Sequence, residues 1–276
     1  MIEMMIKKIW ISMIIGLFLT AGSADLFSAE MTGRDIMKKQ KELHDIQSEM
    51  VKEIMLLVDK SGGKEKRTLI RQGIELEPDE NRFLLVFTSP ADIKGTSVLT
   101  WEHKDRNNDQ WLYMPAKRKL QRIASGSKKN YFMGTDFTYE DLEPEHLDNF
   151  RYTIIKNETL NHDKKDQTCW VIESEPANEE KANSSGYGKR ILWVEKKHYT
   201  TLKVEFYDKR DRLLKTLTNH AMKNVEGTIW LPQKTFMRHH QKNHKTLTLV
   251  TDRAINIHID ENVFTERYIL TGKHVQ

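Results

Sequence analysis

The chain has 276 residues, of which 30% are charged and 38% are hydrophobic, and its formal net charge is +4. A small positive excess among charges of both signs does not indicate a nucleic-acid-binding protein. The single cysteine, Cys169, excludes an internal disulfide, and beside Trp170 and Val171 it is expected to be a small buried hydrophobe. The fold therefore depends on a hydrophobic core, and the length suits one large β domain.

Residues 1–29 have the layout of a cleavable secretory signal. Two lysines precede an apolar run over residues 9–19, and small residues follow that run. An uncleaved membrane anchor is the alternative, but a bilayer-spanning helix needs about 20 apolar residues and this run is much shorter. We therefore expect cleavage between residues 24 and 30. The mature protein, residues 30–276, is expected to be a single domain that is exported to the periplasm and soluble there.

The mature part begins with a predicted helix over residues 32–47. Thr32 and Asp35 match a capping box, and the apolar residues that follow fall near one face. From about residue 49 onward the pattern becomes strand-like, with turn residues between segments. The sequence predicts strands over residues 50–58, 68–75, 82–88, 97–103, 109–114, 118–124, 150–157, 168–174, 190–195, 201–207, 212–219, 228–238, 245–251 and 253–259. Short strands joined by local turns predict an antiparallel meander.

The apolar pattern also indicates how the sheet is covered. Residues Arg253–Ile259 alternate between apolar and polar, which predicts a strand with one dry face and one wet face. Residues Phe83–Phe87 are apolar throughout, which predicts a strand covered on both faces. We expect a curved sheet whose concave side is closed by two candidate lids, the helix at 32–47 and the loop-rich stretch 124–149. The polar run Glu179–Gly188 predicts an exposed hairpin loop.

Residues 109–142 combine aromatic rings with basic side chains, a mixture that suits binding of an amphiphile. The candidates for lining an apolar cavity are Trp111, Tyr113, Phe132, Phe137 and Tyr139, and the candidates for a headgroup-binding rim are Arg118 and Arg122. Burying an acyl methylene against such rings is worth roughly 0.8 kcal/mol, and a guanidinium can bind a phosphate. The alternative is that the rings are ordinary core and the basic run is a solvated strand edge, since one sequence does not assign the two faces of a curved sheet.

Three carboxylates, Asp136, Glu140 and Asp141, also lie in this region. Without a partner base they indicate turn caps, or ion pairs with Arg122 and nearby lysines, rather than catalysis. Aromatic residues among basic residues can bind single-stranded nucleic acid, but export from the cytoplasm argues against that partner. No catalytic residue and no nucleic-acid partner are predicted.

Histidines 239, 240 and 244 are candidate metal ligands. His240 and His244 are four residues apart, a spacing that converges only on a helix. Residues Thr235–Thr251 instead predict a hairpin with its turn at 241–243, so we expect the histidines in an exposed loop. No metal ligand and no cofactor are predicted.

Several motifs in the mature chain resemble one protein family. They are Phe87-Thr-Ser-Pro90, Asp92-Ile-Lys-Gly95-Thr96, Trp111-Leu-Tyr-Met-Pro115, Arg122-Ile123, Phe132-Met-Gly-Thr-Asp-Phe-Thr-Tyr-Glu-Asp-Leu142 and Tyr207-Asp-Lys209. In these segments the chain resembles the outer-membrane lipoprotein-sorting protein family, a branch of the LolA/LolB-like superfamily. The resemblance implies a mainly β, α+β fold: an unclosed antiparallel half-barrel with a helical lid around an apolar cavity that receives acyl chains. It also implies no enzymatic activity and no cofactor.

The resemblance leaves two functional hypotheses. The first is a periplasmic carrier that shields the acyl chains of a lipid or lipoprotein during transport to the outer membrane. The alternative is an accessory interaction protein of an inner-membrane exporter of the RND type, without free carrier activity. The expected partners are therefore acyl chains, a membrane surface in transient contact and, in the alternative, the exporter. The protein is expected to be a monomer.

Overall fold

One curved sheet dominates the computed structural model, which describes residues 30–275; residues 1–29, with the predicted signal sequence, and Gln276 lie outside the described residues. Its thirteen strands are, in sheet order, β6 (Lys119–Arg122), β5 (Asp109–Met114), β4 (Ser97–Trp101), β3 (Glu80–Ser89), β2 (Lys64–Glu77), β1 (Ser48–Val58), β15 (His244–Ile255), β14 (Lys234–His239), β11 (Leu213–His220), β10 (Thr200–Tyr207), β9 (Lys189–Glu195), β8 (Lys165–Pro176) and β7 (Phe150–His162).

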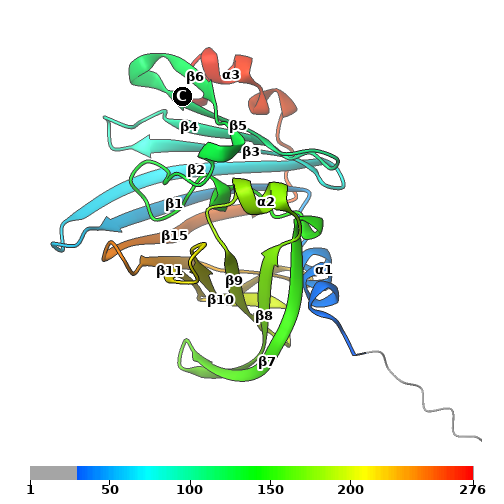
Figure 1. Cartoon of the computed structure of the whole chain (residues 1–276). Helices are drawn as coiled ribbons and strands as arrows, with labels where there is room; N and C mark the ends of the chain where they lie inside the picture. The colour runs from blue at the N-terminus through cyan, green and yellow to red at the C-terminus, as the bar shows by residue number, and fades with distance from the viewer. Residues whose placement is uncertain (1–29, 276) are drawn as a thin grey trace, which may run out of the picture. The chain divides into compact units, whose positions relative to one another are not determined.

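All neighbouring strands in this sheet are antiparallel. Figure 1 shows the sheet running from β6 at the top of the view to β7 at the bottom. The two end strands do not pair with each other, so the sheet remains open. The predicted unclosed antiparallel half-barrel is confirmed. Pairing of β1 with β15 joins the first strand of the described chain to its last.

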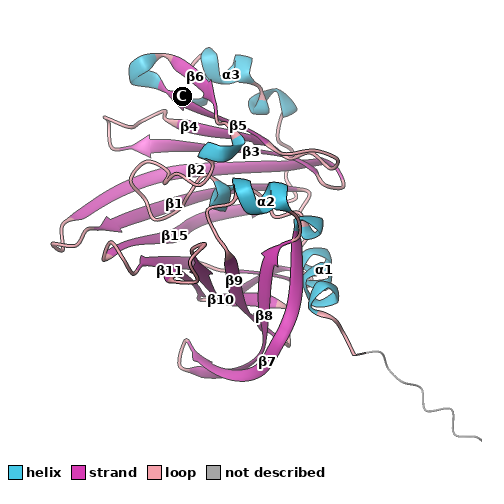
Figure 2. Ribbon diagram, viewed as in Figure 1, coloured by secondary structure: helices cyan, strands magenta, loops and turns pink. Residues whose placement is uncertain are grey.

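The remaining elements are short and lie around the sheet (Figure 2). They are α1 (Gly33–Leu43), α2 (Glu179–Ser184), α3 (Glu266–Leu270), a hairpin of β12 (Lys223–Glu226) and β13 (Ile229–Leu231), and the 3₁₀ turns η1 (Pro115–Lys117), η2 (Ser125–Ser127), η3 (Glu140–Leu142), η4 (Leu147–Asn149), η5 (Glu261–Phe264) and η6 (Lys273–Val275). Within residues 30–275, no helix combines the length and the apolar character that crossing a membrane requires.

Helix α1 begins as the sequence predicts. The Thr32 hydroxyl accepts the backbone N–H of Asp35 at 3.2 Å, and the Asp35 carboxylate accepts the backbone N–H of Thr32 at 2.9 Å, which completes the capping box. The helix ends at Leu43 rather than at residue 47. The Thr32 hydroxyl and the Thr32 backbone N–H both donate to the Asp35 carboxylate and hold the Asp35 pKa below its ordinary value.

Three predicted strands are wrong in part. The predicted strand 228–238 is divided at Pro232, because proline has no backbone N–H for the ladder, and β13 and β14 lie on either side of it. The predicted strands 245–251 and 253–259 form one strand, β15. It ends at Ile255, since Asn256 adopts a left-handed conformation with φ of 53° that turns the chain out of the sheet.

The predicted hairpin loop at Glu179–Gly188 is also wrong in part, because it contains α2. The Asn178 side chain accepts the backbone N–H of Lys181 at 2.8 Å and so caps a short helix. Charge and polarity alone did not distinguish a short solvated helix from a loop.

Both faces of β3 are covered, as its continuous apolar run predicts. We call the face that Phe132 covers the inner face. On it, Leu85 and Phe87 of β3 belong to a cluster with Met55, Leu57, Leu69, Ile93 and Val98. On the opposite, outer face, Leu84 and Val86 pack with Ile74, Leu99, Trp111, Tyr113, Phe264 and Ile269. The C-terminal segment with η5 and α3 therefore covers the outer face of β3–β5.

A second apolar cluster fills the other half of the sheet. Its buried members are Ile36, Phe150, Tyr152, Ile172, Tyr187, Leu192, Val194, Val204, Phe206 and Met237. Ile36 comes from α1 and is fully buried, so the helix packs its apolar face against this half. The close approach of α1 to β7 depends on Gly33, where a Cβ would lie 2.7 Å from the carbonyl oxygen of Tyr152.

Replacing Gly33 with Ala should therefore weaken the docking of α1. The added methyl group meets backbone rather than a movable side-chain tip, so we expect a loss of about 1–3 kcal/mol in the free energy of unfolding, measured by urea denaturation. Gly126→Ala is the control, because a Cβ there meets nothing within 4 Å. Equal stability of the two variants would contradict this account of the contact.

Candidate functional site

Residues 124–149, which we call the strap, cross the inner face of the sheet. Phe132 is fully buried and stacks on Phe87 of β3, with ring centroids 5.5 Å apart. Phe137 packs against the apolar cluster of the other half. The strap thus joins the two apolar halves of the inner face, and the prediction that this stretch covers the sheet is confirmed.

A buried cation anchors the strap to β11. The Lys215 side chain is fully buried, and its Nζ donates to Asp141 Oδ2 at 2.5 Å and to the carbonyl oxygen of Asp136 at 3.0 Å. The rings of Tyr187 and Phe206 lie 5.0 Å from the same Nζ. Burial lowers the pKa of Lys215, and the Asp141 carboxylate opposes that effect. Because an unpaired buried charge is very costly, the ammonium group ties the strap to the sheet.

Further polar contacts fix the strap to β15 and β2, the strands on either side of β1. Asp136 is buried, and its Oδ2 accepts the Thr246 hydroxyl at 2.7 Å and lies 2.8 Å from His244 Nδ1, both on β15. Arg67 of β2 donates from Nη1 to the carbonyl oxygen of Met133 at 2.6 Å. These contacts leave the strap little freedom to shift along the sheet.

Tyr131 is held by a buried histidine of β14. The backbone N–H of Lys242 donates to His239 Nδ1 at 3.2 Å, so Nε2 carries the proton and donates to Tyr131 Oη at 2.8 Å. Burial lowers the pKa of His239 to about 4 and raises that of Tyr131 to about 12. The predicted hairpin is confirmed, but the expectation that the three histidines lie in an exposed loop is wrong. His239 is buried with its ring facing the strap, and His240 and His244 are partly buried.

The larger inner cavity lies between the strap and strands β1–β4 and has a volume of about 410 Å³. Its apolar wall includes Met55, Phe83, Leu85, Val98, Phe137 and Leu142. Its polar wall includes Arg71, whose Nη2 lies 3.1 Å from Glu53 Oε1, and this ion pair raises the pKa of Arg71. The cavity therefore has one side that can accept apolar groups and one side that carries paired charges.

A smaller cavity of about 240 Å³ lies on the other side of Phe137. Its apolar lining includes Phe150, Phe206 and Leu217. Three cations in its wall are each paired with a carboxylate: Lys128 with Glu143, Lys181 with Glu140, and Arg190 with Glu145. Phe137, Asp141, Glu143 and Pro144 line both cavities, so this part of the strap forms the wall between them.

Three of the five predicted cavity residues are brought together by the strap. Phe137 lines both cavities, whereas Phe132 and Tyr139 line neither and pack edge-on against each other with centroids 5.6 Å apart. Trp111 and Tyr113 lie elsewhere, in the outer-face cluster beneath the C-terminal segment. Side chains alternate along β5, so it is Leu112 between them that packs on the inner face.

The two predicted rim arginines line neither cavity. Arg118 is exposed in the β5–β6 connection, and Arg122 donates from Nε to Asp109 Oδ1 at 3.0 Å. Burial raises the pKa of Asp109, but hydrogen bonds from Arg106, Arg122 and His103 outweigh it and hold that pKa well below the ordinary value. The expectation that Arg122 pairs with strap carboxylates is therefore wrong.

The strap carboxylates are structural, as the sequence indicates. Asp141 accepts from Lys215 and Tyr187, and Glu140 Oε1 lies 3.0 Å from Lys181 Nζ. The cavity residues of β1 and β2 were missed. Glu53 and Arg71 lie in strands that carry several other charged residues, so nothing local in the sequence marks these two as facing a cavity.

The fold is shared with several solved structures. A domain from Vibrio parahaemolyticus described as an outer membrane lipoprotein-sorting protein is 31% identical, with a TM-score of 0.80 over 86% of this chain and 98% of that domain. A DUF1329 family protein from Desulfovibrio piger is 23% identical, with a TM-score of 0.79 over 86% of this chain and 97% of that protein. A LolA superfamily protein from Nitrosomonas europaea is 19% identical, with a TM-score of 0.68 over 86% of this chain and 99% of that protein.

A family model described as "Uncharacterized protein" matches residues 79–271. A comparison with curated proteins gave no match. The matched residues include the strap and most strands of the sheet.

Replacing Asp141 with Asn should release the strap. The substitution keeps the side-chain shape but leaves the buried Lys215 without its counter-charge, so we expect a loss of about 3–5 kcal/mol in the free energy of unfolding. Urea denaturation measures that loss, and limited proteolysis should cleave residues 124–149 sooner than in the wild type. Asp148→Asn is the control, because the Asp148–Arg34 pair is exposed and should contribute little. Similar losses in both variants would show that Lys215 does not anchor the strap.

Acid should weaken the fold through His239. Folding holds this ring neutral down to about pH 4, whereas an unfolded histidine binds a proton below about pH 6.5. The unfolded state therefore binds more protons as the pH falls from about 6.5 to about 4, and folding loses at most about 3 kcal/mol from this group. In urea denaturation at pH 7 and pH 5, His239→Gln should lose less stability on acidification than the wild type. An equal loss would mean that other groups cause the acid sensitivity.

Proposed function

The chain belongs to the outer membrane lipoprotein-sorting protein family, and on that premise we propose that it is a periplasmic carrier that shields the acyl chains of a lipid or lipoprotein during transport to the outer membrane. The observation that supports this proposal is the cavity of about 410 Å³ between the strap and strands β1–β4. Its volume falls in the range of about 300–1,000 Å³ that is common for small-molecule sites. Export and periplasmic location are part of the proposal.

The cavity chemistry suits an acyl chain. Met55, Leu85, Val98 and Leu142 offer aliphatic surface, and Phe137 adds a rigid ring. Each buried methylene contributes roughly 0.8 kcal/mol, so a chain of about twelve carbons gains on the order of 10 kcal/mol before the entropic cost of association is subtracted. Binding of this kind needs shape and apolar area rather than a specific polar contact.

The polar wall gives the bound chain an orientation. Arg71 lies on the cavity wall with its side chain partly exposed, so its guanidinium can meet an anionic headgroup while the chain lies against the apolar wall. Arg118 and Arg122 are at the β5–β6 edge and are less suited to that role. We therefore propose Arg71 as the headgroup-contacting cation and Phe137 as the central cavity residue.

Filling the cavity should abolish binding of the chain. We expect delipidated protein to bind a long-chain fatty acid with a dissociation constant of micromolar or lower, measured by titration calorimetry, with a negative heat-capacity change. In Leu142→Trp a larger side chain enters the cavity from the strap, where it should weaken binding by at least about tenfold. Because this substitution adds volume and keeps an apolar side chain, weaker binding would indicate loss of space rather than loss of a single contact.

The matched control is Leu120→Trp, which makes the same change at a partly buried residue of the outer-face cluster. It should bind as the wild type does once both variants are shown to be folded. Equal weakening in both variants would remove the cavity as the binding site. Absence of binding in the wild type would sink the carrier proposal and favour the alternative, an accessory protein that docks on an inner-membrane exporter.

A further inference from the structure

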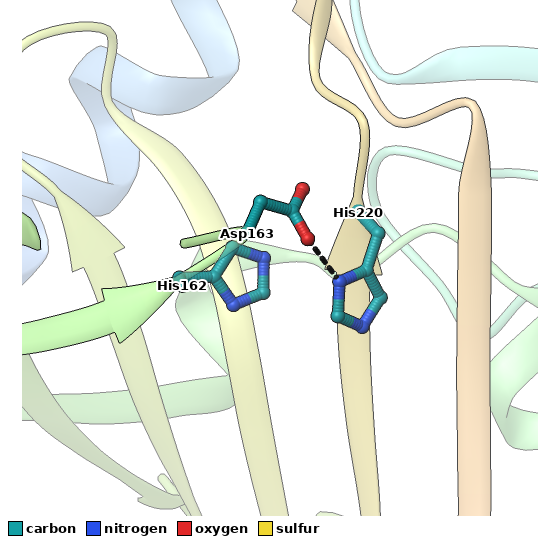
Figure 3. Close-up of side chains that lie close together, drawn as sticks. All are labelled: His162, Asp163 and His220. Carbon is teal, nitrogen blue, oxygen red and sulfur yellow. Dashed lines mark hydrogen bonds and ion pairs between the residues drawn. The ribbon is translucent and has the colours of Figure 1, made fainter. Parts of the chain in front are cut away.

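A second cluster of chemically capable side chains lies outside both cavities. His162 ends β7, Asp163 occupies the β7–β8 turn, and His220, 57 residues further along, ends β11. Figure 3 shows the Asp163 carboxylate between the two imidazoles, with His220 Nδ1 2.7 Å from Asp163 Oδ1. The rings are nearly parallel, with centroids 4.7 Å apart. One ligand atom from each of the three residues lies within 4.8 Å of the others.

Neighbouring groups hold each of these side chains in position. His162 Nε2 donates to the carbonyl oxygen of Asn219 at 2.6 Å, and His220 Nε2 lies 2.8 Å from the Thr218 hydroxyl. Asp163 Oδ2 accepts the backbone N–H of Ala221 at 2.7 Å, which leaves Oδ1 directed at His220. Metal-binding histidines and carboxylates are oriented by contacts of this kind.

We propose that His162, Asp163 and His220 bind one divalent transition-metal ion of the Zn²⁺ type. Two imidazoles and one carboxylate are a ligand set that zinc accepts, with a fourth position left for water. Mg²⁺ and Ca²⁺ prefer oxygen ligands and fit this set poorly. Asp163 is exposed and His220 is partly exposed, so an ion can reach the cluster from solvent.

Metal binding requires a small local adjustment. Zinc–ligand distances of about 2.0–2.1 Å place the ligand atoms of a tetrahedral site about 3.3 Å apart. The ion would replace the Asp163–His220 hydrogen bond of 2.7 Å and draw His162 closer. Both changes fall at turns, where the β7–β8 connection and the chain after β11 come together.

A bound ion would join two hairpins that are distant in the sequence. The β7–β8 turn and the end of β11 are linked here by the Asp163 contacts with His220 and Ala221. A ligand that binds only the folded state raises its stability in proportion to the logarithm of free ligand concentration. The site is therefore a stabilising device at one edge of the half-barrel, separate from acyl binding.

The test is a zinc titration of untagged protein after treatment with a chelator. Titration calorimetry should show one zinc ion per chain with a dissociation constant of micromolar or lower, and thermal denaturation should show a higher midpoint with zinc. His220→Ala and Asp163→Asn should each weaken binding by more than about tenfold. Loss of a residue that only hydrogen-bonds to a metal ligand can already lower metal affinity by about that factor. Magnesium and calcium should leave the midpoint unchanged.

The control variant is His146→Gln, at the other group with suitable ligand atoms, Asp79, Glu102 and His146. It should bind zinc as the wild type does. Any one of three results would overturn the proposal. The wild type binds no zinc, the affinity is unchanged in both His220→Ala and Asp163→Asn, or binding is lost only in His146→Gln. Circular dichroism of each metal-free variant establishes that it is folded.

Discussion

The arrangement of the inner face depends on one buried ion pair, Lys215 with Asp141. An ammonium group at the centre of an apolar sheet face is tolerated only because the strap brings a carboxylate and a backbone carbonyl to it. The same contacts place Phe132 over one apolar half of the sheet and Phe137 over the other. The strap is thus held by charge and polar hydrogen bonds, whereas the space beneath it is lined mainly by apolar side chains. This division lets the cavity stay open without the strap collapsing into it.

The two inner cavities place paired charges beside apolar surface. Every cation in their walls has a carboxylate partner, as in the pairs of Arg71, Lys181 and Arg190. On the outer face, the C-terminal segment covers β3–β5 with Phe264 and Ile269, and a third pocket of about 620 Å³ lies beside Ile74 and Ile259. The strap lines the two inner cavities but not the third pocket, so it can control access only to the inner ones.

Local patterns in the sequence predicted most of the elements but not the pairing of distant ones. The Thr32–Asp35 capping box and the strand segments were readable because their signals lie within a few residues. The β1–β15 pairing was not readable, since nothing local to residue 50 specifies a partner about 200 residues later. Trp111 and Tyr113 were assigned to the cavity because composition reveals how apolar a segment is, whereas one position of strand register decides which face it covers. Nothing in the sequence near Lys215 indicated that it is buried and paired, because its partner Asp141 is distant in the sequence and lies on the strap.

The place of Phe137 in the wall between the two cavities has a consequence for selectivity by size. If acyl chains occupy the larger cavity as proposed, a short chain fits within it and leaves Phe137 in place. A longer chain must displace part of this wall, and rotation of the Phe137 ring would connect the larger space to the smaller one. Rotation removes the ring from its apolar neighbours and costs that burial. The methylenes that enter the smaller cavity must together offset this cost before they increase the affinity. Affinity would then rise with chain length in two steps rather than smoothly, and the position of Phe137 would set the length at which the second step begins.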